Sequence, residues 1–77
     1  MAQIDGDAFF AQFARITGAL AAPSRLKLLD RLCQGEQTVE QLADAAELSL
    51  PNASRHLRQL AEAGLAAVRR DPPRVFY

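Results

Sequence analysis

The 77-residue chain has no tryptophan, one cysteine, one histidine and one methionine, and it contains no long apolar run. A single cysteine cannot form a disulfide within the chain, so a disulfide-stabilised scaffold is excluded. Because no apolar stretch approaches about 18 residues, a membrane-spanning helix is not expected either. Asp5 and Asp7 stand where a secretory signal would place basic residues, so we expect a cytoplasmic protein with no membrane partner.

Catalytic and metal-binding patterns are also missing. The sequence has no H-E-x-x-H, no G-x-x-x-x-G-K, no G-x-S-x-G and no pair of cysteines. Asp44 and Glu47 suit an exposed helix end better than an acid and base pair. We therefore predict a protein that is not an enzyme and that has no metal site and no cofactor.

The chain has room for one domain, residues 1–77. A domain of this length buries only about 60% of its unfolded surface, so a partner subunit would help to stabilise it. The net charge is zero, but residues 1–50 hold four basic and seven acidic side chains, a net −3. Residues 51–77 hold five basic and two acidic side chains, a net +3. A surface that binds a polyanion would therefore lie in the C-terminal part of the chain.

The apolar spacing in residues 7–20 predicts an amphipathic helix. One stripe of that helix carries Phe9, Phe13, Ile16 and Leu20, with Phe10 and Thr17 beside it. Three of the four phenylalanines lie here, which is more than a small domain can cover. We therefore expect residues 1–20 to form a dimerisation helix, with an interface of Phe9, Phe10, Phe13 and Ile16. The alternative is that these residues only join an intramolecular core.

A second helix should begin at Pro23, whose missing N–H suits a first turn, and end near Gly35. Its predicted buried face carries Leu26, Leu29, Leu32 and Cys33. A buried free cysteine usually behaves as a small hydrophobic residue. The alternative for Cys33 is a redox or sulfide sensor, which would need an exposed thiolate near positive charge.

Residues 42–64 predict two short helices separated by a tight turn, which is the pattern of a helix-turn-helix. The first of these helices should begin at Val39, behind a capping box that opens with Thr38. For the second, Ser49 is a favoured N-terminal cap, but Leu50 precedes a proline and is biased away from helical dihedral angles, so the start is open between Leu50 and Pro51. This helix should end at Gly64, because glycine suits the left-handed position after a helix.

The second helix of this pair has one apolar and one polar face. Ala53, Leu57 and Gly64 mark the buried side at about 100° per residue. The opposite side suits a major groove, because arginine can bind guanine and asparagine or glutamine can bind adenine. The predicted DNA-binding residues in this region are Ser49, Pro51, Asn52, Ser54, Arg55, His56, Arg58 and Gln59. The alternative is an ordinary solvated helix face.

Residues 65–77 predict a small hairpin, with strands at 65–70 and 74–77. The adjacent Pro72 and Pro73 make a stiff tip that cannot supply the positive dihedral angles of a tight two-residue turn. A basic hairpin after a helix-turn-helix is a wing, whose Arg69, Arg70 and Arg74 would contact phosphates or enter a minor groove. The predicted fold is therefore mainly α with a small β-hairpin, a winged helix-turn-helix.

Over about residues 8–77 the sequence resembles the ArsR family of bacterial winged-helix repressors. The matching segments are A-x-P-S-R-L-x-L-L at 21–29, L-x-x-A at 42–45, L-S-x-P-x-x-S-R-H-L at 48–57 and A-G-L at 63–65, followed by R-R and V-F-Y. The resemblance implies a homodimer that binds an inverted-repeat operator in double-stranded DNA and represses transcription until an unidentified effector binds. By position it assigns recognition to Asn52, Ser54, Arg55 and Arg58. It leaves His56 to brace the helix or touch phosphate.

The sequence departs from the family pattern in two ways. Arsenic- and metal-sensing members carry Cys-x-Cys at the start of the third helix, where this chain has Thr38 and Glu40, so soft metals have no thiolate pair there. The chain also ends before the fifth helix, which in other members carries metal ligands and half of the dimer interface. The segments at 13–16 and 52–54 resemble a subset fused to a rhodanese-like domain. The alternative function is therefore a DNA-binding or protein-association module that regulates such a sulfurtransferase fusion.

Overall fold

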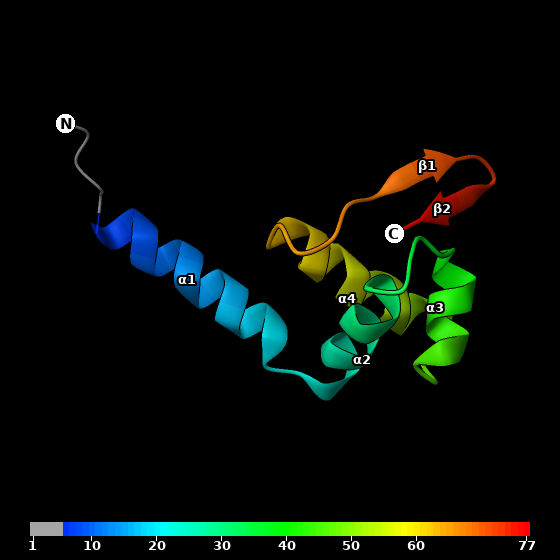
Figure 1. Cartoon of the computed structure of the whole chain (residues 1–77), viewed down its shortest axis with the longest axis horizontal. Coiled ribbons are helices and arrows are strands. Elements are labelled where there is room, and N and C mark those ends of the chain that lie inside the picture. The colour runs from blue at the N-terminus through cyan, green and yellow to red at the C-terminus, as the bar shows by residue number, and fades with distance from the viewer. Residues whose placement is uncertain (1–5) are drawn as a thin grey trace.

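The computed structural model describes residues 6–77 as four helices followed by a hairpin (Figure 1). The helices are α1 (Gly6–Leu20), α2 (Pro23–Leu32), α3 (Val39–Ala45) and α4 (Leu50–Glu62), and the strands are β1 (Arg69–Asp71) and β2 (Arg74–Phe76). This order confirms the predicted fold class. Asp5 and the start of the predicted dimerisation segment 1–20 lie outside the described residues. None of the described helices is long and apolar enough to cross a membrane.

The core lies where α2, α3 and α4 meet. Its largest completely buried side chains are Leu28, Leu42, Leu57 and Leu60. Full burial of one such side chain contributes about 1.5–3 kcal/mol to folding. Val75 and Tyr77 of the hairpin pack against this cluster, so the wing rests on the three-helix core.

The buried face of α2 differs from the prediction. Leu28 is completely buried, whereas Leu26 is 50% exposed. Cys33 is exposed at the end of the helix, so the prediction that it lies on the core face is wrong. Leu29 and Leu32 pack against the core as predicted, but leucines occur on more than one side of α2, and packing against α3 and α4 buries Leu28 rather than Leu26. The exposure of Cys33 meets one condition for a sensing thiolate, and a redox role for it stays a prediction.

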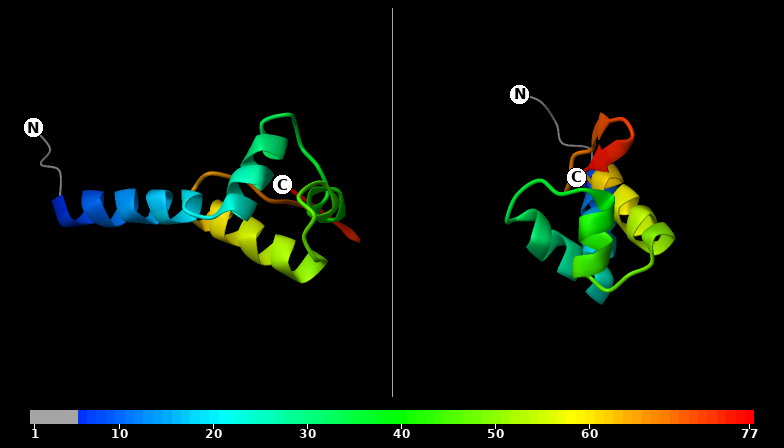
Figure 2. Two further views of the ribbon diagram at one scale, coloured as in Figure 1. Left: turned by 90° about the horizontal axis from the view of Figure 1, so that it is seen from below. Right: turned by 90° about the vertical axis from the view of Figure 1, so that its right-hand side faces the viewer.

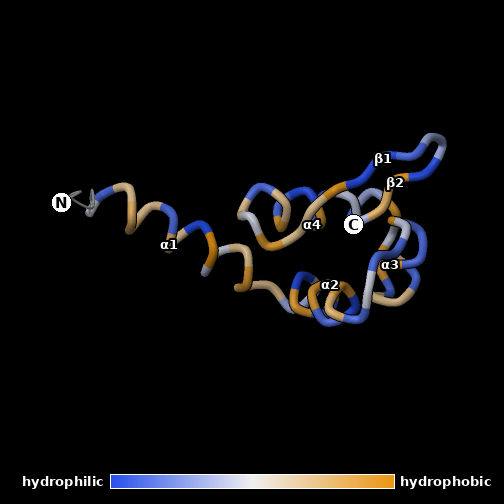
Figure 3. Tube along the Cα trace, turned by 45° about the horizontal axis from the view of Figure 1, so that its top comes forward, coloured by the Kyte–Doolittle hydropathy of each residue, from blue (hydrophilic) through white to orange (hydrophobic). Residues whose placement is uncertain are grey.

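Helix α1 extends away from the three-helix core in Figure 1 and in the left view of Figure 2. Only Ala19 of this helix is buried, and the rings of Phe9, Phe10 and Phe13 are 54%, 67% and 59% exposed. Phe9 stacks on Phe13 with ring centroids 6.3 Å apart and meets Phe10 edge-on. Hydrophobic segments recur along α1, although the core does not extend to this part of the helix (Figure 3). In the single chain this aromatic stripe is exposed to solvent.

The helices of the helix-turn-helix have the predicted N-terminal caps. The Thr38 hydroxyl accepts a hydrogen bond from the Gln41 N–H at 3.1 Å, and the Thr38 N–H donates to Gln41 Oε1 at 2.9 Å. The Ser49 hydroxyl accepts from the Asn52 N–H at 3.3 Å. This cap makes Leu50 the first residue of α4, because Ser49 bonds the third N–H of the helix, and it decides the start that the sequence left open between Leu50 and Pro51.

The C-terminus of α4 ends as predicted, with one correction. Gly64 has a φ of 78°, and the N–H of Leu65 donates to the Leu60 carbonyl at 2.9 Å. This is the Schellman arrangement, in which glycine occupies the left-handed position. Gly64 is exposed and lies outside the helix, so it does not mark the buried face; Ala63 takes that place in the last turn.

The hairpin is shorter than predicted. β1 begins at Arg69 because Leu65 folds back onto α4 and Ala66 packs against the core. Arg69 pairs with Phe76, and Asp71 with Arg74. Only Pro72 and Pro73 connect the strands, and they are joined by a cis peptide bond. Neither has a positive φ, as expected for prolines, so this two-residue turn is not one of the types that need positive dihedral angles.

A third strand-like segment, which the sequence analysis missed, borders β2. The Gln37 N–H donates to the Tyr77 carbonyl at 3.1 Å, and the Tyr77 N–H donates to the Gln37 carbonyl at 3.0 Å. Thr38 and Phe76 form an antiparallel bridge beside them. β2 therefore lies between β1 and the residues that lead into α3, and this pairing attaches the wing to the helix-turn-helix.

The turn between α3 and α4 contains one residue in a left-handed conformation. Glu47 has a φ of 57°, and the next N–H, of Leu48, donates to the Ala43 carbonyl at 2.8 Å. A left-handed conformation costs a residue with a Cβ about 1–2 kcal/mol. We therefore predict that Glu47→Gly raises the free energy of unfolding by about 0.5–1 kcal/mol, measured by denaturant unfolding.

Glu47→Ala is the matched control for this prediction. It removes the same carboxylate but keeps a Cβ at the left-handed position, so it should give no gain in the free energy of unfolding. Equal stabilisation by alanine and glycine would show that the carboxylate, and not the backbone conformation, is the unfavourable feature.

Candidate nucleic-acid interface

Helix α4 exposes the polar face that its sequence predicts. Its inner side is completely buried at Ala53, Leu57 and Leu60. Of the predicted DNA-binding residues in this region, the exposed ones are Ser49, Pro51, Asn52, Arg55, Arg58 and Gln59, and the partly buried ones are Ser54 and His56. Burial on one side therefore leaves the cationic and amide side chains on the other.

The position of α4 in the fold makes this face accessible. In the two views of Figure 2, α4 lies at the edge of the three-helix group rather than between the other helices. Helix α3 packs against its inner side through Leu42 and Ala43, which are buried with Leu57. The outer face of α4 is therefore presented to solvent along its length.

The arginines of α4 are not neutralised by the protein. Arg55 Nη2 donates to Asn52 Oδ1 on the same helix at 3.4 Å. Among the described residues, neither Arg55 nor Arg58 forms an ion pair within 4.0 Å with a carboxylate. The charges on this helix face are available to an anionic ligand.

Arg25 of α2 also reaches this surface, although the sequence analysis did not include it among the site residues. Its Nη1 donates to Gln59 Oε1 at 2.8 Å. Because arginine has only donors, this bond fixes the amide oxygen toward Arg25 and leaves the amide NH₂ for another acceptor. In this state one lone pair of the Gln59 oxygen is already used, and the free NH₂ is a donor that suits a phosphate oxygen.

His56 lies between the buried and exposed sides of α4, as predicted. Its Nδ1 atom is buried and has no hydrogen-bond partner in the described part of the chain. Burial, and then the nearby positive charges of Arg25 and Arg55, lower the pKa of His56 from its ordinary value, so the imidazole is neutral at pH 7. No group of three or more His, Cys, Asp or Glu side chains among residues 6–77 is arranged to hold a metal ion.

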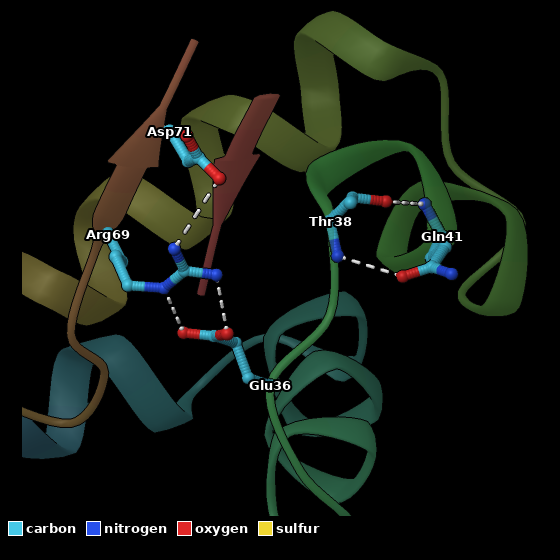
Figure 4. A network of polar contacts seen from close by, with 5 residues as sticks. All are labelled: Glu36, Thr38, Gln41, Arg69 and Asp71. Carbon is cyan, nitrogen blue, oxygen red and sulfur yellow. Dashed lines mark hydrogen bonds and ion pairs between the residues drawn. The ribbon is translucent and has the colours of Figure 1, made fainter. Parts of the chain in front are cut away.

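The three arginines of the wing have different surroundings. Arg70 and Arg74 are exposed, and neither has an ion pair with any described residue. Arg69 is instead bound by Glu36 (Figure 4). Its Nε donates to Glu36 Oε2 at 2.9 Å and its Nη2 to Oε1 at 2.8 Å. The structure therefore leaves two of the three predicted wing arginines free.

A family model described as "Bacterial regulatory protein, arsR family" matches residues 22–68, which contain α2, α3 and α4. The chain belongs to this family. The matched segment contains the whole helix-turn-helix with Arg55 and Arg58, and also Arg25 of α2.

Relatives within this group are regulators and repressors by name. An HTH-type transcriptional regulator of Mycobacterium tuberculosis is 43% identical over 70 residues, which cover 91% of this chain and 31% of that protein. A probable mercury resistance operon repressor of Streptomyces lividans is 41% identical over 64 residues, which cover 83% of this chain and 51% of that protein. The chain therefore spans about a third to a half of the length of these relatives.

A solved structure agrees with the fold along the whole chain. The solution structure of a homodimeric winged helix-turn-helix DNA-binding domain from Mycobacterium bovis, a possible ArsR-family transcriptional regulator, has a TM-score of 0.88 and 40% identity. It covers 100% of this chain and 73% of that chain. The predicted winged helix-turn-helix is confirmed, with α3 and α4 as the helix pair and β1–β2 as the wing.

The surroundings of His56 generate a prediction on stability. The unfolded chain should have a histidine pKa of about 6.5, above that of the folded protein, so the unfolded state binds more protons as the pH falls through this value. Stability should therefore fall between pH 7.5 and pH 5 more steeply for the wild type than for His56→Gln. Urea unfolding midpoints across this range measure the difference, and parallel curves would contradict it.

Proposed function

We propose that this chain is a homodimeric transcriptional repressor that binds an inverted repeat in double-stranded DNA. The proposal rests on the exposed cationic face of α4, whose opposite side is buried in the core at Ala53, Leu57 and Leu60. Membership of the arsR family and the names of its relatives support regulation rather than catalysis as its role. Such a repressor works on DNA in the bacterial cytoplasm.

The geometry suggests which candidate residues contact bases and which contact phosphates. In this proposal the long cationic side chains Arg55 and Arg58 reach base edges in the major groove, with the amide of Asn52 beside them. Backbone phosphates are contacted by the side chains Ser49, Ser54, His56 and Gln59, together with Arg25, while Pro51 packs against the backbone. The exposed Arg70 and Arg74 carry the wing's contacts to phosphate or minor groove.

The homodimer follows from the exposed stripe of α1. An aromatic surface of this kind, made of Phe9, Phe10 and Phe13 with Ile16 beside them, is the type of surface that subunit interfaces bury. The Mycobacterium bovis domain is described as homodimeric, which supports the same assembly here. A two-fold dimer presents two α4 helices, and its symmetry matches that of an inverted repeat.

Base recognition is tested at Arg55. Arg55→Ala should weaken binding to a duplex that the wild type selects from a random-sequence library by about 1–3 kcal/mol, and should relax the preference at one base pair of each half-site. Titrations with single-base variants of the duplex measure both effects. Lys27→Ala is the control, because it removes one exposed positive charge from α2 at a residue outside the proposed contact set.

If the Arg55→Ala protein binds with wild-type affinity and preference, Arg55 does not contact a base. If the wild type itself selects no duplex and binds all DNA with the same weak affinity, the proposed function is wrong.

The dimer is tested at Phe13. Phe13→Asp places two charges in a two-fold interface and removes two rings, so the dimer dissociation constant should rise by at least about 100-fold. Sedimentation equilibrium measures this constant. Ala11→Asp adds the same charge to the opposite side of α1 and should leave dimerisation intact. Equal behaviour of the two variants would exclude the aromatic stripe as the interface.

A further inference from the structure

The wing is attached to the rest of the protein by very short strand pairings. β1 and β2 have three residues each, and the second edge of β2 adds only the Thr38–Phe76 bridge and the two bonds between Gln37 and Tyr77. A two-stranded hairpin is at best marginally stable by itself. The backbone ladder alone is therefore a weak means of fixing the direction of the wing.

Glu36 and Arg69 add a side-chain link across this small sheet. Glu36 directly precedes the segment that pairs with one edge of β2, and Arg69 lies on β1 at the other edge. Their side chains meet in a two-point contact, with nitrogen–oxygen distances of 2.8 and 2.9 Å (Figure 4). Such a contact fixes orientation as well as distance. It ties the outer segment to β1 across β2.

Two further contacts hold the Arg69 guanidinium. Its central carbon lies 4.2 Å from the centre of the Phe76 ring on β2, and its Nη1 lies 3.9 Å from Asp71 Oδ2 on β1. The hydrogen bond from Arg69 also lowers the pKa of Glu36 from its ordinary value, so the pair stays ionised at neutral pH. The guanidinium is therefore engaged by both strands of the hairpin and by Glu36.

We propose that Glu36 is a positioning residue for DNA binding, which acts through Arg69 to hold the wing so that Arg70 and Arg74 meet the DNA backbone. This inference rests on the proposed function. It also revises the sequence-based prediction for Arg69: the guanidinium binds Glu36 of the same chain instead of contacting DNA.

An exposed ion pair contributes little to the overall stability of a domain. Its effect here is on the freedom of the wing. A wing that is already fixed loses less conformational entropy when its arginines bind phosphate, and this preorganisation appears as affinity. Glu36 should therefore matter more for binding than for unfolding.

Removal of the Glu36 charge has two opposite effects, which makes the proposal easy to test. By simple electrostatics, the loss of an acidic side chain raises the affinity for a polyanion, and it also releases Arg69 as an additional cation. If Glu36 positions the wing, the same change lowers the affinity. The direction of the change therefore separates the two explanations.

The test compares Glu36→Gln with the wild type, using the full chain and the duplex that the wild type selects. At about 0.1 M salt the affinity should fall roughly 3- to 10-fold, as expected when side chains must be ordered on binding. The unfolding midpoint should change little. Glu62→Gln is the matched control, because it removes the same charge from an exposed α4 position that has no ion pair in the described chain. Its affinity should be unchanged or slightly higher.

A second variant shows whether Glu36 acts through the wing. The double variant Arg70→Gln/Arg74→Gln should weaken binding and flatten the dependence of log affinity on log salt by about 0.9 for each lost phosphate contact. Addition of Glu36→Gln to this double variant should cause no further loss. A further loss as large as that in the wild-type background, or a Glu36→Gln affinity at or above the wild type's, would overturn the proposal.

A measurement without DNA keeps this inference separate from the proposed function. In the free protein, Glu36→Gln should lower the backbone order parameters and speed the amide exchange of residues 69–76, while α3 and α4 keep their wild-type values. An unchanged hairpin would overturn the positioning role even if the protein binds DNA. If the hairpin becomes more mobile but the protein binds no specific duplex, the proposed function is wrong. The Glu36–Arg69 contact then only restrains the wing.

Discussion

The packing of α4 against α2 and α3 is the constraint on which the other features depend. Leu57 and Leu60 can be buried only if the same side of α4 faces Leu28 and Leu42. Since an amphipathic helix buries one side at a time, this contact also decides which side chains face outward. The charge of Arg55 is therefore directed to solvent by hydrophobic burial on the opposite side of the helix, without any polar contact to the core.

Two polar contacts over long sequence distances border the proposed DNA-binding surface. Arg25 joins α2 to Gln59 on α4, 34 residues away, and Glu36 joins the end of the α2 region to Arg69, 33 residues away. Both contacts are exposed, so neither contributes much to the stability of the fold. Their common effect is to fix the orientation of groups next to the proposed interface. The segment of chain around α2 therefore contacts both α4 and the wing.

Helix α1 has a different relation to the fold from the other helices. The core formed by α2, α3 and α4 takes only one buried residue from α1, Ala19 near its end. A domain of this size has too small an interior to cover a stripe of phenylalanines. An exposed surface of this kind fits association with a second copy of the chain, and the family relationship is consistent with it.

Local and periodic features could be predicted from the sequence, because each involves residues within about four positions of one another. They include the Thr38 and Ser49 caps, the left-handed Gly64 and the two faces of α4. The exposure of Cys33 and the contacts of Arg25 with Gln59, of Glu36 with Arg69 and of β2 with residues 37–38 could not be predicted in this way. They depend on which side of α2 is buried and on pairing between residues more than 30 positions apart, and only packing in three dimensions decides these.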